Sequence, residues 1–332
     1  METRTLGRTG TPVSVIGLGT WQLGADWGEV APDAARAVLD AAVESGITFF
    51  DTADVYGDGR SESFIGEYLA GKPELAITVA TKMGRRAEQD PANFTLDNFR
   101  AWTDRSRRNL RTDTLDLVQL HCPPEEVYSS QKVFDALDTL VAGGAVAHYG
   151  VSVETTDQAL AAIARPGVAT VQIILNAFRL KPLDAVLPAA AAAGVGIIAR
   201  VPLASGLLTG KYTESTVFAE NDHRNFNRDG SAFDVGETFS GVDYEQGVAA
   251  AREFAALVGE QPTTADLSPT QAALAWIAQL DGVSTVIPGA RTPEQARANA
   301  VAGSAQRLGV AFNQAVVDLY DRYFRAAVHQ RW

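Results

Sequence analysis

Short apolar stretches alternate with amphipathic stretches along most of the chain. Most apolar stretches lack strict apolar–polar alternation, which is typical of strands that are buried on both faces of a parallel sheet. The amphipathic stretches repeat their apolar positions at helical spacing, and several end in glycine, as helices commonly do. The eight predicted strands cover residues 13–20, 47–54, 75–82, 115–122, 146–152, 169–176, 195–202 and 283–290. The helices predicted between them cover residues 32–46, 61–71, 96–110, 130–144, 154–164, 183–194, 269–279 and 293–303.

Eight strands that alternate with helices predict an α/β fold, a closed (β/α)₈ TIM barrel that forms a single domain over residues 1–332. An open doubly wound sheet is the alternative, but residues 17–24, GLGTWQLG, lack the glycine spacing of the turn that usually opens such sheets. Residues 2–13 predict a hairpin that turns at Gly10 and closes the bottom of the barrel. Residues 209–245, after the seventh strand, are too long for an ordinary connector and predict a lid or substrate loop.

Composition limits the kind of protein that the chain can be. The chain has 332 residues, of which 46% are hydrophobic and 20% are charged, as in ordinary globular proteins. Its single cysteine, Cys122, excludes internal disulfides and Cys-rich metal sites, so we expect no metal and a cytoplasmic location. No apolar run approaches the ~18 residues of a membrane span, and a net charge of −12 disfavours nucleic acids and anionic membranes. We therefore expect a monomer that acts on small molecules, and any anionic ligand requires a local basic pocket.

Polar side chains stand at the ends of the predicted strands. In a barrel of this kind, the C-terminal strand ends carry the functional residues. The second, third and fourth strands are neighbours, so their terminal residues Asp51, Lys82 and His121 should converge. Tyr56 should lie above them, in the loop that follows Asp51. The other strand ends contribute Thr20, Trp21, Ser152, Gln172, Asn176, Arg200 and the turn from Gly289 to Arg291.

The four converging side chains suit proton transfer. A phenol with a pKa of about 10 is a poor acid at neutral pH, but a cation held beside it favours the phenolate. Lys82 can supply that cation beside Tyr56, and a buried lysine needs a carboxylate partner such as Asp51. His121 can orient a substrate oxygen. Each residue alone has an ordinary structural explanation, but together they predict a tyrosine that donates a proton to a carbonyl that is becoming an alkoxide.

Seven segments of the sequence carry a resemblance to a known family. They are IGLGTW (16–21), FFDTADVYG (49–57), VATK (79–82), LVQLH (117–121), YGVS (149–152), PLASGLLTGK (202–211) and VIPGAR (286–291). Through these segments the chain resembles the aldo-keto reductases over nearly its whole length. The resemblance implies reversible reduction of an aldehyde or ketone by hydride transfer, with NADP(H) as the preferred cofactor and NAD(H) possible. It also implies that Tyr56 is the general acid, that Lys82 and Asp51 tune it, and that His121 orients the carbonyl.

The resemblance further implies where the nicotinamide cofactor binds. Ser152 and Gln172 match positions that hold the carboxamide in relatives. Residues 202–211 match the loop that covers the pyrophosphate, in which Ser205 and backbone amides donate to phosphate. Arg291 is the expected partner of a 2′-phosphate, because its planar fork suits phosphate oxygens. The implied cofactor-binding residues are Thr20, Trp21, Asp51, Ser152, Gln172, Arg200, Pro202, Leu203, Ser205, Gly206, Lys211, Gly289, Arg291, Gln295 and Asn299.

Three features depart from the pattern of many aldo-keto reductases. Val153 follows the strand-five serine where many relatives have asparagine, so one carboxamide contact is missing or is supplied elsewhere. Arg200 ends the seventh strand in place of a tyrosine, and its guanidinium could stack on the nicotinamide instead. Gly289 and Gln295 stand where some relatives have a lysine and an arginine, which weakens the expected preference for NADPH over NADH.

The sequence leaves two alternative functions and the identity of the substrate undetermined. Potassium-channel β-subunits are similar in fold and keep the cofactor but act mainly through a membrane partner, so a cofactor-binding regulatory subunit is the alternative. A Schiff-base aldolase on the same barrel would use Lys82 as its nucleophile, but it leaves Tyr56 and residues 286–291 unexplained. Aromatic side chains either line an apolar substrate pocket or lie singly on the surface, and these are Trp21, Trp27, Phe218, Phe226, Phe233 and Phe239.

Overall fold

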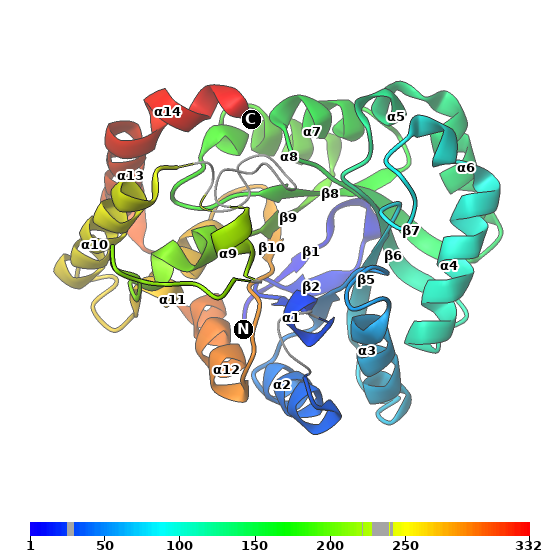
Figure 1. The fold of residues 1–332 in the computed structure, drawn as a ribbon, viewed down its shortest axis with the longest axis horizontal. Coiled ribbons are helices and arrows are strands. Elements are labelled where there is room, and N and C mark those ends of the chain that lie inside the picture. Colours follow the sequence, from blue (N-terminus) through cyan, green and yellow to red (C-terminus); the bar gives the residue numbers. More distant parts are fainter. Residues whose placement is uncertain (25–29, 221, 228–238, 240–241) are drawn as a thin grey trace.

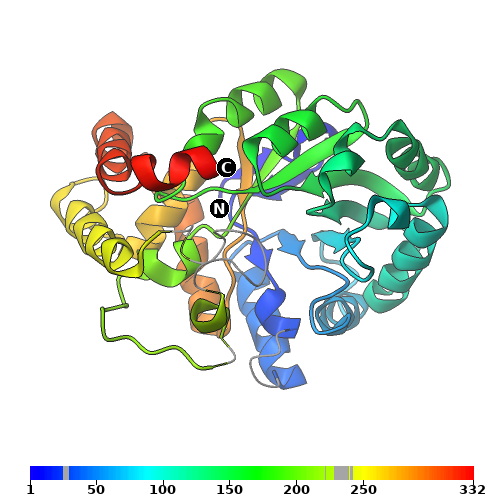
Figure 2. The same ribbon diagram turned by 45° about the horizontal axis from the view of Figure 1, so that its top comes forward.

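Eight parallel strands, surrounded by helices, form a closed barrel (Figures 1 and 2). The strands pair in chain order, and parallel bridges from Ile16 to Val286 and from Gly19 to Gly289 join the first barrel strand to the last. The predicted (β/α)₈ barrel is therefore confirmed, and the doubly wound alternative is wrong. The computed structural model describes residues 1–24, 30–220, 222–227, 239 and 242–332. The strands are β1 (Thr3–Thr5), β2 (Pro12–Ser14), β3 (Leu18–Gly19), β4 (Phe49–Asp51), β5 (Thr78–Met83), β6 (Leu115–His121), β7 (Val146–Ser152), β8 (Val168–Ile174), β9 (Gly196–Arg200) and β10 (Val283–Val286).

The ends of several helices follow sequence signals. At α7 and α11, Thr155 and Ser268 accept hydrogen bonds from the backbone N–H groups of Gln158 and Gln271, whose side chains complete capping boxes. The sequence patterns do not predict α10 and α13, which pack against each other outside the strand–helix repeat. The helices are α1 (Trp21–Gly24), α2 (Pro32–Glu44), α3 (Arg60–Ala70), α4 (Leu96–Leu110), α5 (Glu125–Ser129), α6 (Gln131–Ala142), α7 (Thr156–Ile163), α8 (Val186–Ala193), α9 (His223–Phe226), α10 (Tyr244–Glu260), α11 (Pro269–Ala278), α12 (Pro293–Val301), α13 (Gly309–Tyr320) and α14 (Ala326–Val328).

The N-terminal hairpin closes the bottom of the barrel, as predicted. Strands β1 and β2 pair antiparallel, and Leu6 and Val13 are fully buried in a cluster with side chains of the barrel strands. Gly7 lies against Gly196, and a Cβ atom at position 7 would be 2.0 Å from the Gly196 nitrogen. Only glycine fits there, and it also has a positive φ of 51°. The barrel interior is thus filled from below, and a ligand site is left to the opposite end.

The long loop after β9 is anchored by an aromatic cluster, which consists of Tyr212, Phe218, Phe239 and Tyr244. Their ring centroids lie 5.1–6.1 Å apart. Phe218 and Phe239 are buried in the hydrophobic core and so do not lie on the surface, and neither is among the described residues that line the main cavity. The aromatic groups that fall outside the described part of the chain are Trp27, Phe233 and the side chain of Phe226.

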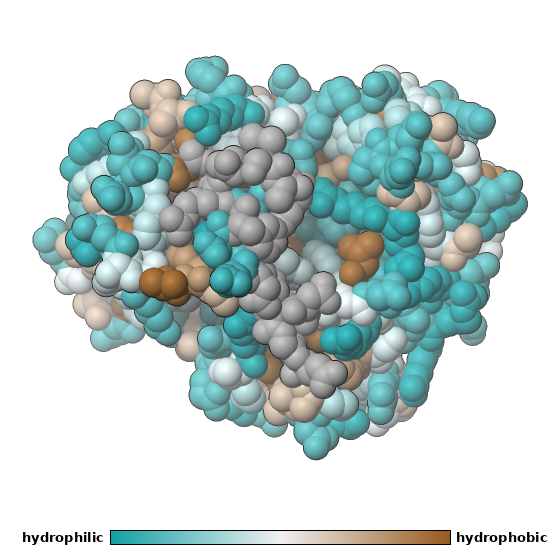
Figure 3. Space-filling model, in the orientation of Figure 1, coloured by the Kyte–Doolittle hydropathy of each residue, from teal (hydrophilic) through white to brown (hydrophobic). Residues whose placement is uncertain are grey.

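The outer surface is mostly polar. Figure 3 shows one face of the molecule as largely hydrophilic, with small and separate hydrophobic areas. Trp21 is one of the few large hydrophobic side chains that are exposed among the described residues, at 36%. Within those residues, no helix combines the length and the apolar character that a membrane span requires.

Candidate active site

A buried ion pair joins the ends of β4 and β5. Asp51 ends β4, and Lys82 lies near the end of the neighbouring strand β5. The Lys82 ammonium nitrogen lies 2.5 Å from Asp51 Oδ1 and donates to the Thr52 carbonyl oxygen at 2.8 Å. It also donates to the hydroxyl oxygen of Tyr56 at 3.3 Å. The structure therefore brings these three predicted residues into direct contact.

Lys82 keeps its charge in this buried position. Its side chain is 1% exposed, and that of Asp51 is 3% exposed. Burial disfavours the ammonium, but the charges and hydrogen bonds of Asp51 and Tyr56 outweigh burial and raise the pKa of Lys82 above its ordinary value. A Schiff-base nucleophile has to be an uncharged amine. The environment of Lys82 therefore argues against the aldolase alternative.

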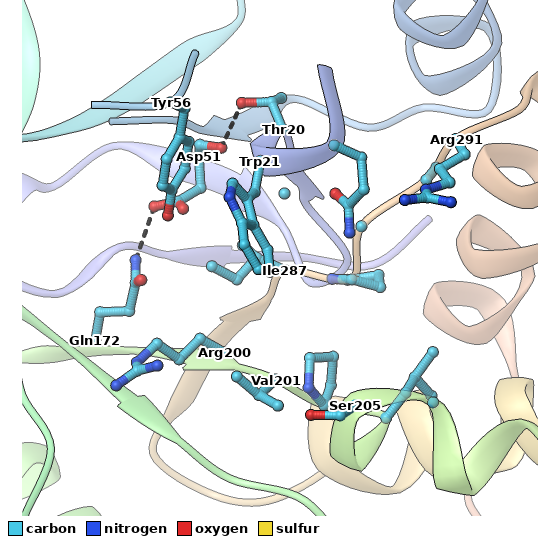
Figure 4. A pocket seen from close by; sticks show the side chains of 18 of the residues that line it. Thr20, Trp21, Asp51, Tyr56, Gln172, Arg200, Val201, Ser205, Ile287 and Arg291 are labelled. Atoms are coloured by element: carbon cyan, nitrogen blue, oxygen red, sulfur yellow. Dashed lines mark hydrogen bonds between the residues drawn. The ribbon is translucent and has the colours of Figure 1, made fainter. Parts of the chain in front are cut away.

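Two glutamines hold the second oxygen of Asp51. Gln172 Nε2 donates to Asp51 Oδ2 at 2.7 Å, as Figure 4 shows, and Gln119 Nε2 donates to the same oxygen at 3.3 Å. The resemblance implies that Gln172 holds the carboxamide. Gln172 lines the cavity, but its amide nitrogen donates to Asp51. Gln119 is a residue that the sequence analysis missed. The available signal was an amide between the apolar residues Val118 and Leu120 of the strand LDLVQLH.

His121 ends β6 and faces Tyr56 across the strand ends. The two ring centroids are 6.1 Å apart in an edge arrangement, and the Trp21 ring lies 6.5 Å from that of Tyr56. Arg85, which the sequence analysis also missed, donates through Nε to the His121 carbonyl oxygen at 3.2 Å. Its Nη2 lies 3.4 Å from Glu154 Oε1. Arg85 thus ties the backbone that carries His121 to the loop after β7.

A cavity of about 410 Å³ lies at these strand ends (Figure 4). Tyr56 and His121 line it, while Lys82 lies behind Asp51 and Tyr56. Thirteen of the residues expected to bind a cofactor also line it, and these are Thr20, Trp21, Asp51, Ser152, Gln172, Arg200, Pro202, Leu203, Ser205, Gly206, Gly289, Arg291 and Gln295.

Two residues expected at the cofactor do not line the cavity. Lys211 is exposed beyond the Gly210 turn. Asn299 is buried, and its amide nitrogen donates to the Gly289 carbonyl oxygen at 3.2 Å. Asn299 therefore supports the turn after β10 from behind. Helical spacing correctly relates Asn299 to Gln295, but spacing alone does not show which residue of a helix faces the ligand.

The loop after β9 has a strained backbone where it meets the cavity. Val201, Ala204 and Ser205 have positive φ angles of 51°, 48° and 54°, and Gly206 has a φ of 100°. Such conformations are costly for residues other than glycine and cluster at functional sites. Ser205 Oγ also accepts a hydrogen bond from the backbone N–H of Phe239 at 3.4 Å. The strained segment is thereby attached to the aromatic cluster.

Arg200 ends β9 and is nearly buried, at 9% exposed. Its Nη2 donates to the Val153 carbonyl oxygen at 3.3 Å and lies 3.9 Å from Cys122 Sγ. Arg200 therefore contacts the backbone of the residue that follows Ser152 at the end of β7. Figure 4 shows Arg200 on the cavity wall opposite Tyr56 and Trp21. This places a cation at the same end of the cavity as the catalytic candidates.

The turn after β10 presents Arg291. Its backbone N–H donates to Gln295 Oε1 at 2.7 Å, so Gln295 fixes the turn. A Cβ atom at position 289 would lie 2.1 Å from Gln22 Nε2. The Gln22 amide lies where a side chain at position 289 would begin, but it ends a flexible side chain, so the contact alone does not require glycine there.

Among the residues that the structure describes, three arginines line the cavity, namely Arg200, Arg224 and Arg291. The acidic residue among the described lining residues is Asp51, whose charge is balanced by Lys82. In a chain of net charge −12, these arginines supply the basic lining that an anionic ligand requires. Arg224 is not predicted from the sequence, because it lies in a polar segment without periodicity.

Comparisons with known proteins agree with this geometry. Residues 15–319 match the model of the Aldo/keto reductase family. An uncharacterized oxidoreductase of Mycobacterium bovis is 32% identical over 301 residues, which are 89% of this chain and 85% of the relative. A solved glycerol dehydrogenase of Gluconobacter oxydans is 29% identical, with a TM-score of 0.76 over 94% of this chain and 93% of that chain. The holo form of an aldo-keto reductase of Bacillus halodurans is 27% identical, with a TM-score of 0.77 over 96% of each chain. The chain therefore belongs to the aldo-keto reductase family and is an oxidoreductase.

Proposed function

We propose that the protein reduces an aldehyde or ketone to an alcohol with NADPH, in a reversible reaction. The observation that carries the proposal is the contact of Lys82 with both Asp51 and Tyr56 at the wall of the cavity that His121 also lines. A fixed positive charge beside a phenol favours transfer of its proton to an oxygen that gains negative charge. When a hydride is added to the carbonyl carbon, this proton transfer to its oxygen completes the alcohol.

The lining of the cavity fits a nicotinamide dinucleotide. Its arginines and the Ser205 hydroxyl are suited to phosphate oxygens. Gln22 Oε1 is buried, and no hydrogen-bond partner for it is found in the part of the chain that the structure describes. Because Gln22 also lines the cavity, this oxygen can accept a hydrogen bond from a ligand. Bound in this cavity, the cofactor supplies the hydride.

Side chains from four elements hold the two ends of the cofactor in this proposal. Ser152 and Gln172 bind the carboxamide, and Arg200 lies against the nicotinamide ring. Arg291 binds the 2′-phosphate of NADPH. With glycine at position 289 and a neutral Gln295, Arg291 is the cation of this turn, so we expect NADPH to be preferred and NADH to bind more weakly.

Each catalytic residue has a separate role in the proton transfer. Tyr56 donates its hydroxyl proton to the carbonyl oxygen in reduction and takes a proton from the alcohol in oxidation. The Lys82 charge stabilises the phenolate that forms, and Asp51 keeps Lys82 charged. His121 donates a hydrogen bond that orients the substrate oxygen. Gln119 and Gln172 keep Asp51 in place through their hydrogen bonds to Oδ2.

The test is a screen for oxidation of NADPH and NADH by the purified protein. The panel should hold aldehydes, ketones and sugars, and small polyols should be offered with NADP⁺, because the Gluconobacter oxydans relative is a glycerol dehydrogenase. The proposal expects turnover of at least one carbonyl compound. Binding of NADPH without turnover of any panel member would instead favour the regulatory-subunit alternative.

A further inference from the structure

Two arginines hold the loop that carries Tyr56. This tyrosine loop runs from Asp54 to Asp58, between β4 and α3. Arg105, on α4, donates through Nη1 to the Asp54 carbonyl oxygen at 3.1 Å. Its Nη2 donates to the Asp58 carbonyl oxygen at 2.6 Å and to Asp58 Oδ1 at 2.9 Å. Arg86, in the loop after β5, donates through Nη1 to the Asp54 carbonyl oxygen at 3.3 Å and to Asp58 Oδ1 at 2.6 Å. Each guanidinium therefore joins the residues on the two sides of Tyr56.

The C-terminal end of the tyrosine loop has an unusual backbone. Gly57, Asp58 and Gly59 have successive positive φ angles of 59°, 54° and 89°. Such angles are costly for residues with a side chain, although aspartate adopts them more readily than most. A Cβ atom at position 57 would lie 2.2 Å from the Gly24 carbonyl oxygen, so the loop packs directly on the backbone of α1. The position of the loop thus depends on its contacts with other elements.

A displacement of the tyrosine loop would change the contact on which the proposed chemistry depends. Lys82 is anchored on Asp51, whereas its hydrogen bond to the Tyr56 hydroxyl oxygen is 3.3 Å long. Arg86 and Arg105 do not line the cavity. They can therefore affect proton transfer through the position of Tyr56 rather than through contact with a ligand.

We propose that Arg86 and Arg105 are positioning residues that hold Tyr56 in place for proton transfer. The proposal rests on the proposed function, because it assigns the arginines to the reaction in which Tyr56 is the general acid. Both arginines pair with Asp58, whose side chain is 77% exposed, so these ion pairs add little to stability. Their geometric effect is larger, because a displacement of about 1 Å at a reacting group can cost about 10²-fold in rate.

The test uses variants that release the tyrosine loop. Arg86→Gln, Arg105→Gln and the double variant remove the cations, and Arg105→Lys keeps the charge without the fork. Asp58→Asn removes the carboxylate but keeps a residue that adopts a positive φ readily. The matched control is Arg107→Gln, because Arg107 lies on the same helix α4 and pairs with Asp104 instead of the loop.

Four quantities are measured for each variant. They are kcat and KM for a carbonyl compound found in the screen, the dissociation constant of NADPH, the melting temperature, and amide hydrogen exchange in peptides that span the tyrosine loop. The value of kcat is expressed per molecule of bound NADPH, so that a loss of folded protein does not count as a loss of turnover.

The kcat of the double variant should fall by about 10- to 100-fold. The NADPH dissociation constant and the melting temperature should match those of Arg107→Gln. Because the two guanidinium groups share acceptors, the double variant should lose more than the product of the two single losses. Arg105→Lys should recover part of the loss. The N–H groups of Tyr56 and Asp58 donate to the carbonyl oxygens of Ala53 and Val55, and exchange in this loop should become faster in the double variant.

Wild-type kcat and wild-type loop exchange in the double variant would overturn the proposal. A loss of turnover without faster loop exchange would also overturn it, since the arginines would then act on the fold and not on the loop. If the double variant did not fold, Asp58→Asn would give the same comparison at an exposed side chain. If the wild-type protein reduced no carbonyl compound, the proposed function itself would fall, and loop exchange alone would then decide whether the two arginines hold the tyrosine loop.

Discussion

The ammonium of Lys82 lies 2.5 Å from Asp51 Oδ1 and 3.3 Å from the Tyr56 hydroxyl oxygen, so one buried cation serves a carboxylate and a phenol at once. The contact with Asp51 keeps the charge inside the protein. The contact with Tyr56 places that charge where it can stabilise the phenolate of Tyr56. Because the two contacts involve different partners, their contributions to stability and to catalysis can be separated by mutation.

Tyr56→Phe should remove the proton donor and keep the ring. Turnover should fall by about 10²–10⁴-fold, the usual contribution of general acid–base catalysis. The dissociation constant of NADPH should change little, because the ring still packs beside Trp21 and His121. Steady-state kinetics and a fluorescence titration on the same preparation measure both quantities. Turnover within a few-fold of wild type would remove Tyr56 from its proposed role.

Lys82→Met should destabilise the fold by about 3–5 kcal/mol, because it leaves the Asp51 carboxylate buried without its cation. The double variant Lys82→Met, Asp51→Asn should recover much of that stability, since a neutral amide can still accept from Gln119 and Gln172. The double variant should stay inactive, because no cation remains beside Tyr56. Chemical denaturation and turnover measurements on the wild type, Lys82→Met, Asp51→Asn and the double variant complete the cycle. Activity in the double variant would show that the cation is not needed for catalysis.

Arg291→Ala should weaken NADPH more than NADH, because only NADPH carries the 2′-phosphate. A charge-assisted contact of roughly 1.5–3 kcal/mol corresponds to about 10- to 150-fold in affinity. Arg297→Ala is the matched control, since Arg297 lies on the adjoining helix α12 and pairs with Glu44 outside the cavity. An equal loss of affinity for both cofactors would show that Arg291 does not bind the 2′-phosphate.

Arg200→Tyr should tighten NADP⁺ relative to NADPH. The oxidised nicotinamide ring is cationic, and the Arg200 guanidinium at this end of the cavity disfavours it. Paired titrations of NADP⁺ and NADPH on wild type and variant give the ratio of the two dissociation constants. An unchanged ratio would mean that Arg200 does not lie against the ring. A matching shift towards alcohol oxidation should appear in the kinetics.

Asp54 should make stability depend on pH. Its carboxyl oxygens are buried, and burial together with Glu62 raises the pKa of Asp54 from 3.8 to about 7. The charges of Arg86 and Arg105 and the backbone N–H of Val55 oppose this rise. The folded state therefore binds this proton more tightly than the unfolded state does. The resulting stability is fully present below about pH 4 and is lost as the pH rises through about 7.

The test of this pH dependence is Asp54→Asn, which carries no titrating proton. At pH values above 7 the variant should be more stable than wild type, by at most about 4 kcal/mol. Its melting temperature should also change less between pH 4 and pH 8. Asp90→Asn, at an exposed N-cap, is a control that should leave this part of the pH profile unchanged. Parallel pH profiles of Asp54→Asn and wild type would contradict the prediction.

The sequence predicts the fold and the catalytic candidates for the same physical reason. Strands buried on both faces are recognisable from continuous apolar runs, and the residue that ends such a run is placed at the C-terminal rim by the barrel itself. Asp51, Lys82 and His121 are therefore located by strand position alone. Helices α10 and α13 escape this reasoning, because they pack against each other and no barrel strand follows them directly.

The residues that were missed act through contacts between distant parts of the chain. Gln119 meets Asp51 across the barrel, 68 residues away, and Arg85 meets the His121 carbonyl 36 residues away. The position of the Arg224 side chain depends on the conformation of its loop. Aromatic side chains at both ends of the loop stabilise that conformation. No local periodicity reports any of these contacts. The same limit explains why Lys211 was expected at the pyrophosphate, since charge and proximity in sequence do not determine which side chain faces the cavity.

The hairpin below the barrel makes hydrogen bonds with a segment of the chain that is synthesised much later. Arg4 donates to the Val283 carbonyl oxygen at 2.8 Å, and 279 residues separate them. Ser284 Oγ donates to the Thr5 carbonyl oxygen at 3.1 Å. The hairpin leaves the ribosome early but meets these partners only after the strand at residue 283 has emerged. Contacts over such separations form slowly, so the barrel is closed only after the strand that contains Val283 has been made.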